Sequence, residues 1–203
     1  RDLRLDVDGK LSISPIPEIH TLRVPGTRRH LYTMPDGLWG ERTVANGSSL
    51  ELQLKCHGTP AHRQGSTVGM KILATTDQNT FTVVGYDYGV RKLFVDHRNS
   101  TAGLNATDIV QTAPLGPEFQ DDRIELYILV DNALVESFLN CRVVLSSWIS
   151  EVMHDTNTMP NDRSVFVADV PTGVTCSLQS WKLQSLEVNI GFANAMQSRD
   201  HAV

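Results

Sequence analysis

Residues 124–149 alternate between apolar and other side chains, and this alternation constrains the fold more than any other stretch of the chain. Apolar residues occupy every second position over 124–130, and the alternation resumes over 135–139. The polar triplet 140–142 then precedes a second β-rich run over 143–149. Alternation with a period of two marks half-buried strands, because successive side chains point to opposite faces of a sheet. We therefore predict a β-hairpin within an antiparallel sheet.

Shorter β-rich runs recur along the chain, and clusters of turn-forming residues separate them. Their spacing is typical of an all-β sandwich, and no stretch beyond residue 49 repeats apolar residues at helical intervals. We therefore predict a two-sheet antiparallel β-sandwich of the concanavalin or lectin-like jelly-roll kind, preceded by an extended linker. Residues 98–120 are expected to form a long loop. The predicted strands lie within residues 1–11 (around an Asp8-Gly9 turn), 49–56, 67–75, 80–87, 92–97, 124–131, 133–139, 142–149, 164–170 and 175–183.

The first 25 residues differ from the rest in their proline content. Three prolines fall within residues 12–25, and proline restricts both its own φ and the preceding residue. We predict an extended connector there. The expected division is a strand and linker over 1–25, a sandwich domain over 26–188 and a weakly structured tail over 189–203.

Charge and hydropathy exclude several classes of partner. A net charge of -5 gives no polycation for nucleic acid or an anionic membrane. No apolar run reaches the length of a membrane span. The chain begins with Arg1, so a signal peptide is expected to be removed already or to lie outside this sequence.

The three cysteines allow one disulfide and one free or intermolecular thiol in an oxidising compartment. Cys56 and Cys176 both fall in predicted strands, which makes them the preferred pair. Three unpaired thiols remain the alternative. Cys141 falls in the predicted hairpin turn.

Three N-x-S/T sequons point towards a secreted glycoprotein. Each lies beside small residues in a loop-like context, and together they predict an extracellular location. The three predicted acceptors are Asn46, Asn99 and Asn105.

Exposed aromatic rings would suit the binding of sugars, because they can stack on apolar C–H faces. Trp39 and Tyr88 fall in predicted loops or turns and are the carbohydrate-binding candidates. Trp148 and Trp181 fall in apolar strands, where core packing is expected. The histidines and cysteines lack the spacing of a zinc site, so no metal and no cofactor is predicted.

The acidic residues of the predicted strands and strand ends are expected to satisfy backbone donors instead of forming a catalytic pair. Glu136 lies in the strongest strand and is predicted to be a partly buried carboxylate with an arginine partner. The others in this group are Asp87, Asp96 and Asp131.

The pattern D-x-x-x-x-E-x-F-x-N over 131–140, followed by R-V-V-L-S-S over 142–147, closely resembles the C-terminal β-sandwich of glycoside hydrolase family 32. This family comprises invertases, inulinases, levanases and fructosyltransferases. Further matches are D-G-K-L over 8–11, K-L-F-V-D over 92–96 and W-K-L-Q-S-L over 181–186. The chain departs from the family where 131–136 lacks an arginine and a serine and where Cys141 occupies the hairpin.

The resemblance implies that residues 1–25 are the last strand and linker of a five-bladed catalytic propeller. The aspartates and the glutamate of the family's catalytic motifs find no match in this chain. The resemblance thus implies a non-catalytic module that stabilises the propeller of a secreted enzyme, in an extracellular, vacuolar or cell-wall location. The parent enzyme would hydrolyse or transfer fructosyl units of sucrose or fructans, and a homodimer is a further implied partner. The alternative is a free-standing lectin-like module that binds carbohydrate without catalysis.

Overall fold

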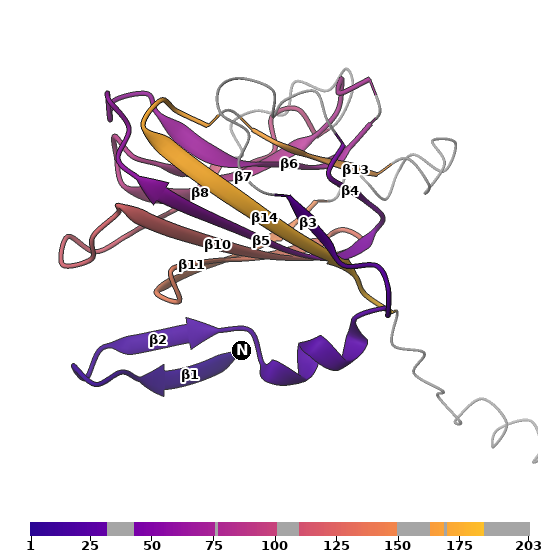
Figure 1. Ribbon diagram of the computed structural model, residues 1–203, viewed down its shortest axis with the longest axis horizontal. Coiled ribbons are helices and arrows are strands. Elements are labelled where there is room, and N and C mark those ends of the chain that lie inside the picture. The colour runs from indigo at the N-terminus through magenta and orange to yellow at the C-terminus, as the bar shows by residue number, and fades with distance from the viewer. Residues whose placement is uncertain (32–42, 76, 101–109, 150–162, 169, 185–203) are drawn as a thin grey trace, which may run out of the picture.

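In the computed structural model, strands make up just over half of the described residues, which also contain one short 3-10 helix (Figure 1). The described residues include no helix that is long and apolar enough to cross a membrane. The predicted tail over 189–203 lies outside the described residues. The described residues are 1–31, 43–75, 77–100, 110–149, 163–168, 170–184.

The first sheet of the sandwich contains six antiparallel strands in the order β12-β11-β10-β5-β14-β3. Its centre is the long strand β5, which pairs with β10 on one side and β14 on the other over nine residue pairs each. The predicted hairpin is β11 with β12, and it forms one edge of the sheet. The bounds are β3 Arg29–Leu31, β5 Ser49–Gly58, β10 Arg123–Asp131, β11 Leu134–Leu139, β12 Val143–Trp148 and β14 Val174–Lys182.

The second sheet also contains six antiparallel strands, in the order β4-β13-β6-β7-β8-β9. A hydrogen bond of 2.5 Å from Ser147 Oγ of β12 to Gln111 Oε1 of β9 joins the edges of the two sheets. The predicted two-sheet sandwich is therefore confirmed. The bounds are β4 Ala45–Asn46, β6 Thr67–Ala74, β7 Thr82–Asp87, β8 Lys92–Asp96, β9 Val110–Pro114 and β13 Ser164–Val167.

The core lies between the sheets and follows the predicted alternation. In β10, Leu126 and Ile128 are fully buried, and Leu52 and Leu54 oppose them from β5 in direct register. Side chains of the second sheet, such as Met70, close the core from the other side. Burying one such side chain contributes about 1.5–3 kcal/mol, so the core makes a large favourable contribution to folding.

The turn between β11 and β12 is held by Asn140. Both Asn140 and Cys141 have a positive φ, 51° and 52°, as a tight hairpin turn of the primed type requires. The Asn140 side chain accepts a hydrogen bond from the Glu125 backbone N–H at 2.6 Å and donates one to the Arg123 carbonyl at 3.0 Å. Asparagine tolerates this backbone conformation better than most residues, which explains its position here.

The predicted loop over 98–120 contains a strand that the sequence analysis missed. Strand β9 pairs with β8 at the edge of the second sheet. Its Val-Gln-Thr-Ala-Pro sequence gives little β signal, because an edge strand needs no apolar face and tolerates a terminal proline. The short strands β3 and β4 were missed for the same reason.

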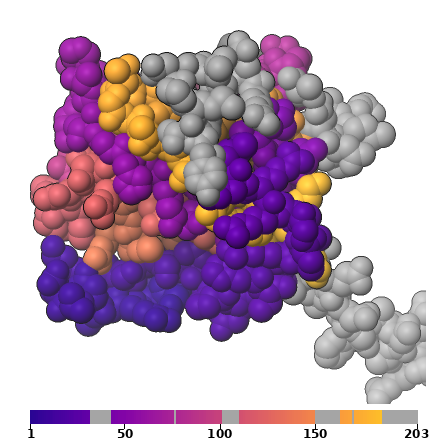
Figure 2. Space-filling model, in the orientation of Figure 1, coloured from indigo at the N-terminus to yellow at the C-terminus, as the bar shows by residue number. Residues whose placement is uncertain are grey.

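The N-terminal segment forms a layer of its own against the sandwich (Figures 1 and 2). Strands β1 (Asp2–Leu5) and β2 (Leu11–Ser14) form the expected hairpin, with Gly9 at a φ of 73°. The prediction of an extended connector over 12–25 was wrong in part, because Pro17–Leu22 is a 3-10 helix. The first backbone N–H groups of a helix have no partner within the helix, so a proline at this position loses no hydrogen bond. Pro17 can therefore begin the 3-10 helix.

Candidate functional site

The two carbohydrate-binding candidates of the sequence analysis do not form a site. Trp39 lies outside the described residues. Tyr88 is only 1% exposed, and its ring packs edge-on against Tyr86 with the ring centroids 5.0 Å apart. The prediction for Tyr88 was therefore wrong, since the residue closes the core after β7. Burial raises the pKa of Tyr88 to about 12, as expected for a phenol removed from water.

The expected core position of Trp148 was also wrong, whereas Trp181 is buried as predicted. Trp148 is 57% exposed and Trp181 is 8% exposed. Alternation places the neighbouring Ser147 on the core side of β12, so the indole of Trp148 points outward. It is paired across the hairpin with Leu134, which is 38% exposed. The pattern identified the strand, but an apolar residue can also lie on its outer face.

The acidic residues of the strands have structural partners, as predicted. Asp87 Oδ1 accepts hydrogen bonds from the backbone N–H groups of Gly89 and Val90 at 2.7 and 3.2 Å. Glu136 has the predicted arginine partner, Arg1, at 2.8 Å, and its side chain is 27% exposed. These contacts fix a turn and the start of the chain and leave no catalytic pair among them.

A buried ionic cluster on β5, which the sequence analysis missed, fixes the linker to the first sheet. The Glu51 side chain is fully buried, although alternation along β5 places it on the outer face. Arg23 binds both of its carboxylate oxygens, with Nε to Oε2 at 2.6 Å. The Arg23 guanidinium also lies 3.9 Å from the ring centroid of Trp181. The two ion-pair partners are 28 residues apart, so no local pattern could have predicted the contact.

A second ionic cluster, also missed, joins the loop before β10 to the second sheet. Asp121 is 4% exposed and accepts hydrogen bonds from Arg63 at 2.7 and 3.0 Å and from Tyr86 at 3.0 Å. Burial alone would raise the pKa of Asp121, but the hydrogen bonds from Arg63 and Tyr86 hold this pKa below its usual value. A carboxyl group held ionised in this way is a structural anchor and not a proton donor at neutral pH.

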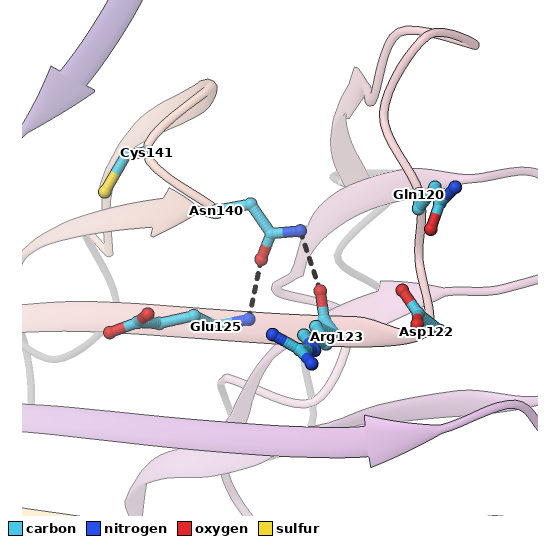
Figure 3. A pocket seen from close by; sticks show the side chains of 6 residues that line it. All are labelled: Gln120, Asp122, Arg123, Glu125, Asn140 and Cys141. Atoms are coloured by element: carbon cyan, nitrogen blue, oxygen red, sulfur yellow. Dashed lines mark hydrogen bonds between the residues drawn. The ribbon is translucent and has the colours of Figure 1, made fainter. Parts of the chain in front are cut away.

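A polar hollow of about 510 Å³ lies between the β9–β10 loop and the β11–β12 turn (Figure 3). Its carboxylates, Asp122 and Glu125, lie at opposite ends of the hollow with Arg123 between them. Glu125 is also bound by Lys55 at 3.0 Å. A retaining glycosidase needs two carboxyl groups about 5 Å apart facing one bond, and this arrangement does not supply them. The lining residues are Gln120, Asp122, Arg123, Glu125, Asn140 and Cys141.

A second hollow of about 420 Å³ lies between the 3-10 helix and the outer face of the first sheet. Leucine and isoleucine side chains form much of its lining, and polar side chains share it. Its position next to Trp148 follows from Leu134, which lines the hollow and pairs with Trp148 across the hairpin. The lining residues are Ile19, Leu22, Ser49, Leu129, Val130, Asp131, Asn132, Leu134, Glu136, Leu183 and Gln184.

The cysteines lie in two different environments. Cys56 of β5 and Cys176 of β14 are directly paired and form a buried disulfide with a sequence separation of 120. Cys141 is a free thiol. Partial burial raises the pKa of Cys141, and Glu125 adds to the rise, so the nucleophilic thiolate is disfavoured.

Two sequon asparagines are accessible in the structure. Asn46 of β4 and Asn99, in the turn after β8, are both exposed. They belong to the second sheet and its turns. Asn105 lies outside the described residues. Within the described part of the chain, no three His, Cys, Asp or Glu side chains gather in a way that could hold a metal ion.

Comparison with known proteins identifies the sandwich. A family model described as "Glycosyl hydrolases family 32 C terminal" matches residues 18–175. A levanase of Bacillus sp. (strain L7) is 34% identical over 147 residues, which are 67% of this chain and 14% of that protein. A levanase of Bacillus subtilis (strain 168) is 29% identical over 130 residues, which are 63% of this chain and 18% of that protein.

Solved structures share the same fold. The exo-inulinase of Aspergillus awamori superimposes with a TM-score of 0.67 at 20% identity, covering 90% of this chain and 34% of that one. This chain thus spans less than a fifth of the two levanases and about a third of the inulinase.

Proposed function

Because the chain belongs to the family of C-terminal domains of glycoside hydrolase family 32, we propose that it is the non-catalytic module of a fructoside-cleaving enzyme. The enzyme would hydrolyse or transfer terminal fructosyl units of sucrose or a fructan. The module would stabilise an upstream catalytic propeller. Support comes from the two levanases, which the chain matches over a small part of their length.

The observation that carries this proposal is the N-terminal hairpin. Leu3 pairs with Ile13 and Leu5 with Leu11, so these four side chains share one face. Leu3, Leu5 and Leu11 are 61%, 72% and 50% exposed, so this face points away from the sandwich. A two-stranded hairpin is marginal alone and needs a further layer on its apolar face. We propose that the upstream domain supplies this layer.

The backbone edge of β2 and the turn of the hairpin bind the sandwich through polar contacts. Arg142 forms an ion pair with Asp6 and donates a hydrogen bond to the Leu11 carbonyl at 2.8 Å. The Ile13 N–H donates to the Cys141 carbonyl at 2.8 Å. The hairpin would therefore join two domains, with polar contacts to one and apolar contacts to the other.

Export is part of the proposal. The buried Cys56–Cys176 disulfide suits an oxidising compartment, and the exposed Asn46 and Asn99 suit glycosylation in a secretory pathway. A homodimer of the isolated chain is a further proposal; where no upstream domain covers it, the apolar hairpin face is the candidate interface.

Two experiments test the proposal. The purified chain is incubated with sucrose, inulin and levan, and released fructose is measured; we expect none, and reproducible turnover by clean material would contradict the proposal. The denatured, deglycosylated protein from its source is then weighed by mass spectrometry. We expect a polypeptide several times heavier than 22.5 kDa. A polypeptide near 22.5 kDa would refute the proposal that the chain is one module of a larger enzyme.

The homodimer has its own measurement, sedimentation of the purified chain. We expect Leu5→Glu to shift a dimer to monomer, while Val90→Glu, at another exposed apolar position between β7 and β8, serves as the control. A dimer that survives Leu5→Glu would exclude the hairpin face as its interface.

A further inference from the structure

The outer face of the β11–β12 hairpin presents an exposed indole beside a hollow. Trp148 and Leu134 are direct cross-strand partners, and such partners have Cβ atoms about 5 Å apart on the same face. Leu134 lines the hollow of about 420 Å³ below the 3-10 helix. Trp148 is 57% exposed and lies next to Leu134, which lines this hollow.

The lining of the hollow combines aliphatic and polar side chains. Leu129, Leu183 and Ile19 supply aliphatic surface, while Asp131 and Asn132 supply polar groups. A sugar ring has the same division, with C–H groups on its faces and hydroxyl groups around its edge. Binding sites for small molecules are commonly apolar hollows of about 300–1,000 Å³ with a few placed polar groups, so the volume is sufficient for a sugar unit.

A fixed polar group completes the site next to the indole. The next cross-strand pair on this face is Glu136 with Ser146. Ser146 Oγ donates to Glu136 Oε1 at 3.1 Å, and Arg1 binds the same oxygen at 2.8 Å. The carboxylate is thus held in place before any ligand arrives, which lowers the entropy cost of binding.

We propose that Trp148 and the adjoining hollow form a carbohydrate-binding site for an oligosaccharide. The indole would stack on the C–H face of one sugar unit, and Glu136 would accept hydrogen bonds from its hydroxyl groups. The choice of fructan as ligand rests on the proposed function. The location of the site is argued from the structure alone. An accessory site of this kind would hold a polymeric substrate near the enzyme without cleaving it.

The test is titration calorimetry of the purified chain with oligosaccharides derived from inulin and from levan, with cellohexaose as a chemically different probe. Trp148→Ala should weaken binding by about tenfold, the loss that corresponds to one good aromatic contact. Glu136→Gln should weaken it less, since an amide oxygen still accepts hydrogen bonds. The control variant Val90→Ala removes an equally exposed apolar side chain between β7 and β8 and should leave affinity unchanged.

Three results would overturn the proposal: no binding of any probe by the wild type, equal affinity of Trp148→Ala and the wild type, or an effect of Trp148→Ala on sedimentation alone. The last result would assign the indole to a protein contact. Binding of cellohexaose but neither fructan probe would keep the carbohydrate site and overturn its fructan assignment. Fructose release, which tests the proposed function, is measured separately, so the two can fail independently.

Discussion

Truncation of Arg23 to alanine is the sharpest perturbation of the link between the linker and the sandwich. It leaves the Glu51 carboxylate, which is fully buried, without its guanidinium partner. Removing one member of a buried ion pair typically costs about 3–5 kcal/mol. The Arg23 side chain is itself 28% exposed, so water can reach the vacated position and the lower end of this range applies. We therefore expect a loss of about 3 kcal/mol in the free energy of unfolding.

Urea denaturation followed by circular dichroism measures this loss directly. For a chain of this size about 3 kcal/mol corresponds to a fall in Tm of roughly 6–12 °C. The matched control is Arg28→Ala, because Arg28 also lies near the Trp181 ring, at 5.8 Å from its centroid, but is exposed and bonded to Gln179 at 3.3 Å. The control should cost less than about 1 kcal/mol, as exposed contacts do.

A double-mutant cycle separates the ion pair from the stacking on Trp181. Glu51→Gln removes the buried charge, so the further loss on adding Arg23→Ala should be smaller than in the wild type. The reasoning would be refuted if Arg23→Ala and Arg28→Ala destabilised the chain equally. It would also be refuted if the effects of Arg23→Ala and Glu51→Gln on the free energy of unfolding were additive.

Three further predictions concern the disulfide, the buried phenol and the sequons. Replacing Cys56 and Cys176 together by alanine should lower the free energy of unfolding in urea by about 4–5 kcal/mol, because the bond closes a loop of 120 residues; a loss below about 1 kcal/mol would contradict this. The pKa of Tyr88 is raised from 10.0 to about 12, so its contribution to stability is complete below pH 10 and is lost as the pH rises towards 12. Tyr88→Phe should flatten the alkaline fall in the urea midpoint, and an unchanged slope would argue against this origin. Secretion from a eukaryotic host should add glycans at Asn46 and Asn99 that an endoglycosidase removes, and no loss of glycan mass on Asn46→Gln or Asn99→Gln would show the respective site to be unused.

The strands and the core were predictable because alternation is a local property. Leu52 and Leu54 follow it along β5 and are fully buried, and the hairpin around 140–142 carries its own turn chemistry. The same rule assigns Glu51 to the outer face of β5, but it does not show that the linker covers that face. Trp148 illustrates the opposite limit, since the sequence cannot distinguish an apolar residue facing the core from one facing outward.

Contacts between distant segments could not be predicted from periodicity. Arg23 and Glu51 meet only because the linker returns over β5, and Arg1 meets Glu136 across 135 residues. The sequence carries one signal at this position, because Leu22-Arg23 resembles the L-R of the family's linker pattern. The pattern identifies the position of Arg23, but it does not identify Glu51 as the partner, because that contact depends on the tertiary structure.

The disulfide between β5 and β14 also determines how the chain behaves when it is cut. Cys56 and Cys176 close a covalent ring that contains most of both sheets. One cleavage at any bond inside this ring would leave a single covalent molecule until the disulfide is reduced. A cleavage between the hairpin and Cys56 would instead remove the covalent link between the N-terminal hairpin and the sandwich, so that only non-covalent contacts would hold the hairpin. The disulfide therefore keeps the sandwich in one covalent piece after a single cleavage inside the ring. The residues before Cys56 have no such protection, so one cleavage there breaks the covalent link to the N-terminal hairpin.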